Sequence, residues 1–103
     1  MIQVCVLYPR GEGRRFDMAY YLGSHIPMVR AKLGAACKGL AVLEGLAGGA
    51  PGSKPPYAAM AQLAFDSPEA FKAAFAPHAA AILGDIPNYT DIEPVIQVSA
   101  IRA

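Results

Sequence analysis

The sequence predicts a small α+β domain, built from a four-stranded antiparallel sheet with two helices on one of its faces. Three observations carry this prediction. Short apolar runs typical of strands occur near both ends and in the middle of the chain, and two segments between them have helical apolar spacing. No linker or internal repeat divides the 103 residues. We therefore expect one domain that spans residues 1–103.

Three of the strands are expected in the first two thirds of the chain. Residues 2–8 are rich in β-branched and apolar residues, which is typical of a central strand. Residues 38–46 form a weaker candidate, followed by a long loop rich in glycine and proline at 45–56. Residues 57–65 contain alanines, which are poor strand formers, but the flanking prolines and the helix start that follows favour a strand.

The first helix is expected from about Asp17, which can cap a helix N-terminus, to Leu33. Pro27 has no N–H group to donate, so this helix should kink or restart near Gly23 and Ser24. A spacing of three and four residues predicts one apolar stripe, made of Met18, Leu22, His25, Val29 and Leu33.

The second helix begins with a strong start signal. Ser67 is a good N-cap and Pro68 fits the first helical position. Pro77 interrupts the helical pattern, which resumes and ends at Leu83 and Gly84. After a polar turn, residues 93–102 alternate as the last strand.

The resulting order of elements is strand, helix, strand, strand, helix, strand. This is the ferredoxin-like pattern, in which one face of the sheet stays uncovered. Hydrophobic residues make up 54% of the chain and charged residues 17%, which is apolar for a chain this short. We therefore predict a homodimer in which two sheets pack together as a dimeric α/β barrel.

Composition also excludes several classes of partner. Nine Lys and Arg residues balance eight Asp and Glu residues without a basic run, so we expect no nucleic-acid partner. No window approaches the about 20 apolar residues of a membrane helix, and we expect no membrane partner. Two cysteines, Cys5 and Cys37, are too few for a disulfide framework, so we expect both reduced in a cytoplasmic protein.

Two segments resemble the EthD family of dimeric α/β-barrel proteins. One is Phe16 to Met28, with its Tyr-Tyr pair and the run His25-Ile26-Pro27-Met28. The other is Asp85 to Asp91, followed by Pro94, Gln97, Ser99 and Ile101. The resemblance implies the fold and the dimer. It implies function only broadly, because related barrels include isomerases, monooxygenases without metal or flavin, and polyketide cyclases or dehydratases.

His25 is the leading candidate for chemistry. An imidazole titrates near neutral pH and suits proton transfer, and this one lies on the predicted apolar stripe. Tyr21 lies one turn earlier and is the better partner for His25, whereas Tyr20 points elsewhere on the helix. The alternative for His25 is a hydrogen-bonded core residue beside the kink, and for Tyr21 a packed ring with a wet hydroxyl.

Further candidates lie in the second half of the chain. Asp85 is a carboxylate that could orient a histidine, or simply form a turn. Tyr89 could cap a pocket or pack on the dimer partner, and His78 could face the pocket or lie on the surface. Gln97 and Ser99 are polar groups on an apolar strand, which could line a cavity or bond across an interface.

The favoured hypothesis is an enzyme that binds a small apolar, oxygen-bearing organic molecule. His25, Tyr21 and Asp85 would carry catalysis by proton transfer or cofactor-free oxidation, and Tyr20, His78, Tyr89, Gln97 and Ser99 would contact the substrate. No metal-ligand or cofactor motif is present, so we expect neither. The alternative is a non-catalytic carrier or accessory protein of an ether- or aromatic-degrading oxidising system. A third, weaker reading is a haem-handling barrel.

Overall fold

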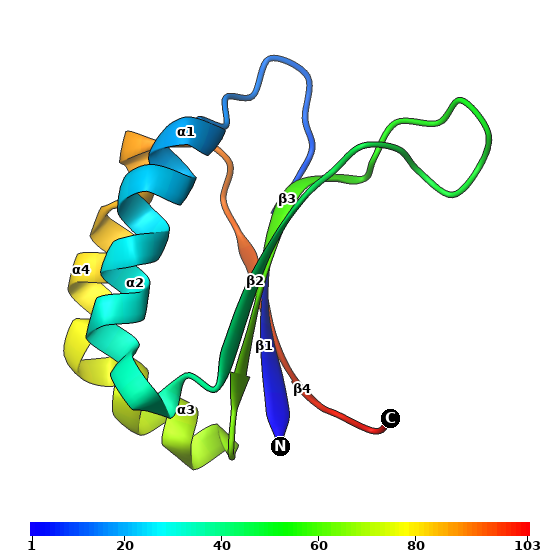
Figure 1. The fold of residues 1–103 in the computed structure, drawn as a ribbon. Coiled ribbons are helices and arrows are strands. Elements are labelled where there is room, and N and C mark those ends of the chain that lie inside the picture. Colours follow the sequence, from blue (N-terminus) through cyan, green and yellow to red (C-terminus); the bar gives the residue numbers. More distant parts are fainter.

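The computed structural model describes all residues from 1 to 103 and has one four-stranded sheet at its centre (Figure 1). The strands lie in the order β2-β3-β1-β4, and every neighbouring pair is antiparallel. Their bounds are Ile2–Pro9 for β1, Gly39–Glu44 for β2, Tyr57–Phe65 for β3 and Val95–Ala100 for β4.

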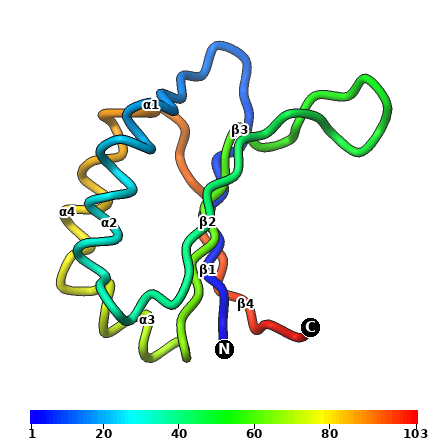
Figure 2. Tube along the Cα trace, viewed as in Figure 1, coloured from blue at the N-terminus to red at the C-terminus, as the bar shows by residue number.

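All helices lie on one side of the sheet, as the chain trace also shows (Figure 2). The regular helices are α1 (Met18–Tyr20), α2 (Ile26–Leu33), α3 (Pro68–Phe75) and α4 (Ala79–Gly84). α1 and α2 belong to one continuous rod, and a turn at Ala76–His78 joins α3 to α4 as a second rod. The predicted ferredoxin-like α+β fold is therefore confirmed.

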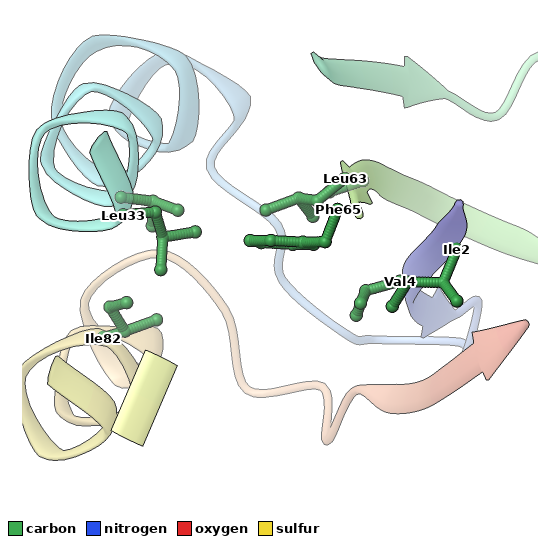
Figure 3. Close-up of a cluster of buried hydrophobic side chains, with 8 residues drawn as sticks. Ile2, Val4, Leu33, Leu63, Phe65 and Ile82 are labelled. Carbon is green, nitrogen blue, oxygen red and sulfur yellow. The ribbon is translucent and has the colours of Figure 1, made fainter. Parts of the chain in front are cut away.

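Strand alternation decides which side chains form the core. Val4 of β1 pairs with Leu63 of β3 on one side and with Val98 of β4 on the other, so all three point to the helices. Figure 3 shows Leu63 and Phe65 of β3 extending toward Leu33 of α2 and Ile82 of α4, with Val4 of β1 on their other side. This aliphatic cluster has eight buried members: Ile2, Val4, Val29, Leu33, Ala61, Leu63, Phe65 and Ile82.

The predicted irregularity in the first helix takes the form of a π-helical turn at Tyr21–His25. Pro27 lacks an N–H group, and the N–H of Ile26 instead donates to the carbonyl of Tyr21, five residues back. The wider turn changes which side chains of this helix face the sheet. The inward-facing row consists of Tyr21, His25, Val29 and Leu33. The prediction that Leu22 lies on the apolar stripe is wrong, because this side chain is 51% exposed.

The helix ends follow the sequence signals. The Asp17 carboxylate accepts from the N–H of Tyr20, and the Ser67 hydroxyl accepts from the N–H of Ala70. Gly34 ends α2 with a φ of +60°, a backbone conformation that favours glycine. No helix is long and apolar enough to cross a membrane.

The opposite face of the sheet carries no helix and no charged side chain on its three central rows. One row across the strands is fully apolar and consists of Leu43, Met60, Leu7 and Val95. The edge strand β4 is exposed on both faces, because even Ile96 and Val98, which point to the helix side, remain 48% and 45% exposed. This chain alone thus leaves considerable apolar surface in contact with water.

Candidate functional site

A cavity of about 240 Å³ lies between the helices and the sheet. Its wall is almost entirely aliphatic and aromatic, and it includes Val6 of β1, Val29 of α2 and Phe75 of α3. Apart from two tyrosines, His25 is the one ionisable residue on this wall. Tyr8 and Tyr21 lie on the same wall, so the side chains with polar atoms among its residues are one histidine and two tyrosines.

The π-helical turn directs His25 inward. Its side chain is 4% exposed, and its ring stacks on that of Tyr21 with centroids 5.5 Å apart and an interplanar angle of 15°. Tyr21 is itself 1% exposed. The expected pairing of Tyr21 with His25 is thus present as a ring stack rather than as a hydrogen bond.

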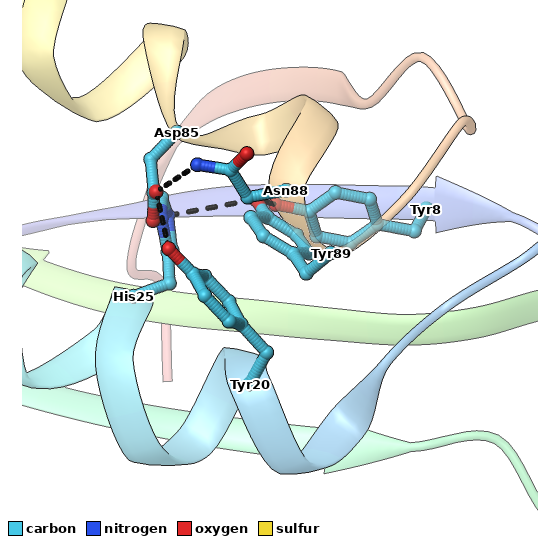
Figure 4. Close-up of polar contacts among 6 residues, drawn as sticks. All are labelled: Tyr8, Tyr20, His25, Asp85, Asn88 and Tyr89. Carbon is cyan, nitrogen blue, oxygen red and sulfur yellow. Dashed lines mark hydrogen bonds and ion pairs between the residues drawn. The ribbon is translucent and has the colours of Figure 1, made fainter.

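Asp85 accepts hydrogen bonds from three side chains (Figure 4). Its Oδ2 lies 2.9 Å from Nδ1 of His25. Its Oδ1 accepts from the Tyr20 hydroxyl at 2.7 Å and from Nδ2 of Asn88 at 2.9 Å. Two donors on Oδ1 fit an ionised carboxylate, and an ionised carboxylate holds the proton of His25 on Nδ1.

The pKa of Asp85 agrees with this assignment. Burial acts to raise that pKa, but the hydrogen bonds from Asn88, Tyr20 and His25 outweigh burial and bring the pKa below its usual range. The same contact acts in the opposite direction on Tyr20, because the bond that it donates to Asp85 raises the pKa of the phenol.

Backbone pairing brings the distant segment 85–92 against the start of the first helix. Phe16 and Thr90 form an antiparallel bridge, and the N–H of Asp17 donates to the carbonyl of Tyr89 at 2.7 Å. The buried Thr90 hydroxyl donates to the carbonyl of Arg15 and accepts from the N–H of Ile92. These contacts hold segment 85–92 against the start of the first helix. His25 thereby reaches Asp85, which lies 60 positions later in the chain.

Tyr89 extends the polar network on the other side of His25. This side chain is 0% exposed, and its hydroxyl lies 3.5 Å from Nε2 of His25, at the outer limit of a hydrogen bond. The hydroxyls of Tyr89 and Tyr8 lie 2.7 Å apart. The network therefore runs from Asp85 through His25 and Tyr89 to Tyr8 on the cavity wall.

The tyrosines of this network stay protonated at ordinary pH. Burial raises the pKa of Tyr8, of Tyr21 and of Tyr89 well above that of a free phenol. Each is therefore a neutral hydroxyl that can donate one hydrogen bond and accept others.

Of the remaining predicted site residues, three lie away from this network, and Tyr20 joins it only outside the cavity. His78 is half-buried at the end of the turn between α3 and α4 and is not on the cavity wall. Gln97 and Ser99 point to the helix-free face of the sheet, where Nε2 of Gln97 donates to the Ser99 hydroxyl at 2.9 Å. Tyr20 lies outside the cavity, and its contact is with Asp85.

Sequence reasoning missed two members of the network, Tyr8 and Asn88. In the sequence, Tyr8 was identified only as the last residue of a predicted strand. Alternate residues of a strand face the same side, so Tyr8 lies on the helix-facing side together with Val4. Asn88 lay in a segment that reads as a turn. No group of three or more histidine, cysteine or acidic side chains is close enough to hold a metal ion.

A four-stranded ferredoxin-like sheet with its helices on one face places the chain in the class of ferredoxin-like α+β domains, here with an apolar cavity between the two layers. The family model of the EthD domain matches residues 10–93, and the chain belongs to this family. The resemblance seen in the sequence is thereby confirmed.

Two solved structures are similar to this chain. An EthD-like protein from Ralstonia eutropha JMP134 is 55% identical, with a TM-score of 0.90 over 95% of this chain and 88% of that one. An ethyl tert-butyl ether (EthD) family protein from Bacillus halodurans C-125 is 14% identical, with a TM-score of 0.69 over 99% of each chain, and supports the fold alone. No match is found among curated proteins.

Proposed function

We propose that this EthD-family protein acts on a small, apolar, oxygen-bearing molecule by proton transfer at His25. The observation that carries the proposal is the orientation of the imidazole. Asp85 binds Nδ1 at 2.9 Å, which leaves the lone pair of Nε2 on the side of Tyr89 and the cavity. A base needs such a free nitrogen within reach of the proton that it removes.

Asp85 would act as a positioning residue in this scheme. It fixes the tautomer of His25 and stabilises the imidazolium that forms when Nε2 takes a proton. Tyr21 would hold the ring plane by stacking and would offer its hydroxyl to a ligand oxygen. Removal of a proton from the ligand is the first step of an isomerisation and also of an oxidation by dioxygen. The geometry at His25 supports this first step, which both reactions share.

Hydrogen–deuterium exchange tests the proposal without knowledge of the natural substrate. β-Tetralone is a neutral bicyclic ketone with acidic C–H groups beside its carbonyl. In D₂O the wild-type protein should accelerate exchange of these protons, which NMR measures directly. His25→Gln should lower that acceleration about a hundred-fold or more, because general base catalysis contributes on that order.

Two controls separate chemistry from folding. Leu22→Ala removes an exposed side chain from the same helix and should exchange like the wild type. A thermal melt of His25→Gln should show a folded protein. Wild-type exchange no faster than buffer, or full acceleration by the folded His25→Gln variant, would contradict the proposal.

A non-catalytic carrier remains the second candidate, and the composition of the cavity wall favours it. Nearly every residue on that wall is apolar, which suits storage of a hydrophobic compound as well as its conversion. A carrier would bind β-tetralone and leave its exchange unchanged in every variant. An accessory role beside an oxidising system, and a cytoplasmic location, stay predictions.

We also propose that two copies pair through the helix-free face of the sheet as a dimeric barrel. The apolar row of Leu7 and its neighbours, together with the exposed edge strand β4, supports this assembly. Gln97 and Ser99 would then lie in the interface rather than in the cavity.

Sedimentation analysis tests the dimer. The wild type should sediment as a dimer, and Leu7→Glu should sediment as a monomer, because it puts a charge in the middle of the apolar row. Leu46→Glu is the matched control, since Leu46 lies in the loop after β2 and is 87% exposed. A monomeric wild type would refute this assembly.

A further inference from the structure

The wall of the cavity reaches the molecular surface at two side chains. Leu83 is 45% exposed and Ile96 is 48% exposed, whereas every other residue on the wall is buried or half-buried. A cavity opens where the residues of its wall meet solvent. Leu83 and Ile96 therefore mark the place where this cavity opens.

The path of the chain brings these two residues to the same edge of the molecule. β3 and β4 run parallel on either side of β1, and the right-handed connection usual for such strands lays α3 and α4 over β1 and this edge of the sheet. Leu83 is in α4, and Ile96 of the edge strand β4 pairs with Val6, which is also on the cavity wall. The opening thus has one side chain from the helix layer and one from the sheet.

The connection from α4 to β4 frames this opening and is held in place. Ile86 and Pro94, near its two ends, lie on the cavity wall. Asp85 bonds to two side chains of the first helical rod, and Thr90 forms the bridge to Phe16. The frame is therefore fixed, which leaves the two side chains at the opening as its variable part.

We propose that Leu83 and Ile96 form the entrance of the cavity and control how fast a ligand enters and leaves. Both side chains are apolar, so the entrance admits uncharged apolar molecules, whereas a charged group would lose its water there without gaining a partner. The inference goes beyond the proposed function, because an enzyme and a carrier both need such a route. It is compatible with the proposed dimer, which pairs through the opposite face of the sheet.

A side chain at an entrance affects rates more than affinity. A ligand must pass Leu83 and Ile96 in both directions, whereas the bound ligand lies mainly against the buried part of the wall. Truncation of either residue therefore accelerates association and dissociation together. The Kd, which is the ratio of the two rate constants, then changes less than either of them.

Stopped-flow fluorescence with 2-methoxynaphthalene tests the inference. A cavity of about 150 Å³ in another protein holds benzene, so about 240 Å³ suits this neutral molecule of two fused rings. The chain has no tryptophan, and Tyr8 and Tyr21 lie on the cavity wall, so quenching of tyrosine emission by energy transfer to the probe reports binding. The time courses give both rate constants.

Three variants change the width of the entrance. Leu83→Ala and Ile96→Ala should each raise the association and dissociation rate constants several-fold, because they remove part of the barrier. Ile96→Phe should lower both, because a larger side chain narrows the opening. Leu22→Ala is the matched control, since Leu22 is 51% exposed on the first helical rod and lies off the wall, and it should keep the rate constants of the wild type.

Rate constants that stay unchanged in both entrance variants with alanine, or a change in dissociation alone, would overturn the inference. A wild type that does not bind the probe would overturn it as well. The probe has no acidic C–H group, so its binding is independent of proton transfer at His25. Faster exchange of the probe in Leu83→Ala, without exchange of β-tetralone protons that depends on His25, would support the entrance and contradict the proposed chemistry.

Discussion

The two ends of the helix–sheet layer differ in what they bury. At one end an aliphatic cluster centred on Val4, Leu63 and Phe65 packs with no polar side chain among its eight buried members. At the other end the rings of Tyr21 and Tyr89 pack on His25, and the ring of Tyr8 packs on both tyrosines. Hydroxyls, an imidazole and a carboxylate therefore need hydrogen-bond partners at this end. The first arrangement stabilises the fold, whereas the second holds chemical groups in fixed positions.

This difference explains the extra constraints at the tyrosine end. Buried polar groups are costly unless they are hydrogen-bonded, and no buried side-chain nitrogen or oxygen lacks a partner here. The π-helical turn and the bridge between Phe16 and Thr90 both lie at this end. The aliphatic end needs no such device, because apolar packing has no required direction.

Truncation at the aliphatic end should have the largest effect on stability. Phe65 is 0% exposed and its ring centroid lies 5.1 Å from that of Phe71, so Phe65→Ala removes a large buried side chain and leaves a void in its place. We expect a loss of about 3–5 kcal/mol in the free energy of unfolding. Urea unfolding followed by circular dichroism measures it.

Leu22→Ala provides the control for that experiment. Leu22 is 51% exposed, and its truncation should change the free energy of unfolding by less than about 0.5 kcal/mol. A loss at Leu22 similar to that at Phe65 would mean that the first helix keeps a regular α-helical register, with Leu22 inside. The comparison therefore also tests the π-helical turn.

The sequence was sufficient for the aliphatic end and much less so for the tyrosine end. Alternation along 2–8 and 57–65 identifies Val4 and Leu63 as inward residues, because a strand has a fixed period of two. Leu22 was misplaced, because one π-helical turn shifts every earlier position relative to a regular helical period. A local irregularity thus has effects that periodicity alone does not predict.

The polar network depends on contacts that lie far apart in the sequence. His25 and Asp85 could be named as candidates from their residue types, but their 2.9 Å contact spans 60 residues of sequence and depends on the backbone pairing of residues 16–17 with 89–90. Tyr8 belongs to a third segment and joins the network through the 2.7 Å contact between its hydroxyl and that of Tyr89. The network is therefore assembled from three distant segments, which no single motif contains.

Acid should weaken the tyrosine end first, with a smaller effect than truncation of the core. The hydrogen bonds to Asp85 bring its pKa below the usual value of about 4. A carboxyl with a lowered pKa in the folded state stabilises the protein above its unfolded pKa and loses that contribution as pH falls through the folded one. The wild type should therefore be more stable than Asp85→Asn near pH 6, and this difference should shrink below about pH 4.

Thermal melts of both proteins from pH 6 to pH 3 measure this difference. Asp66→Asn serves as the control, because Asp66 is exposed just after β3, and its difference from the wild type should stay small and nearly constant. A constant difference between wild type and Asp85→Asn across the range would show that Asp85 is not the ionised acceptor of three donors. The Nδ1 proton of His25 would then lose its fixed position, and with it the fixed polar arrangement that distinguishes this end of the molecule from the aliphatic one.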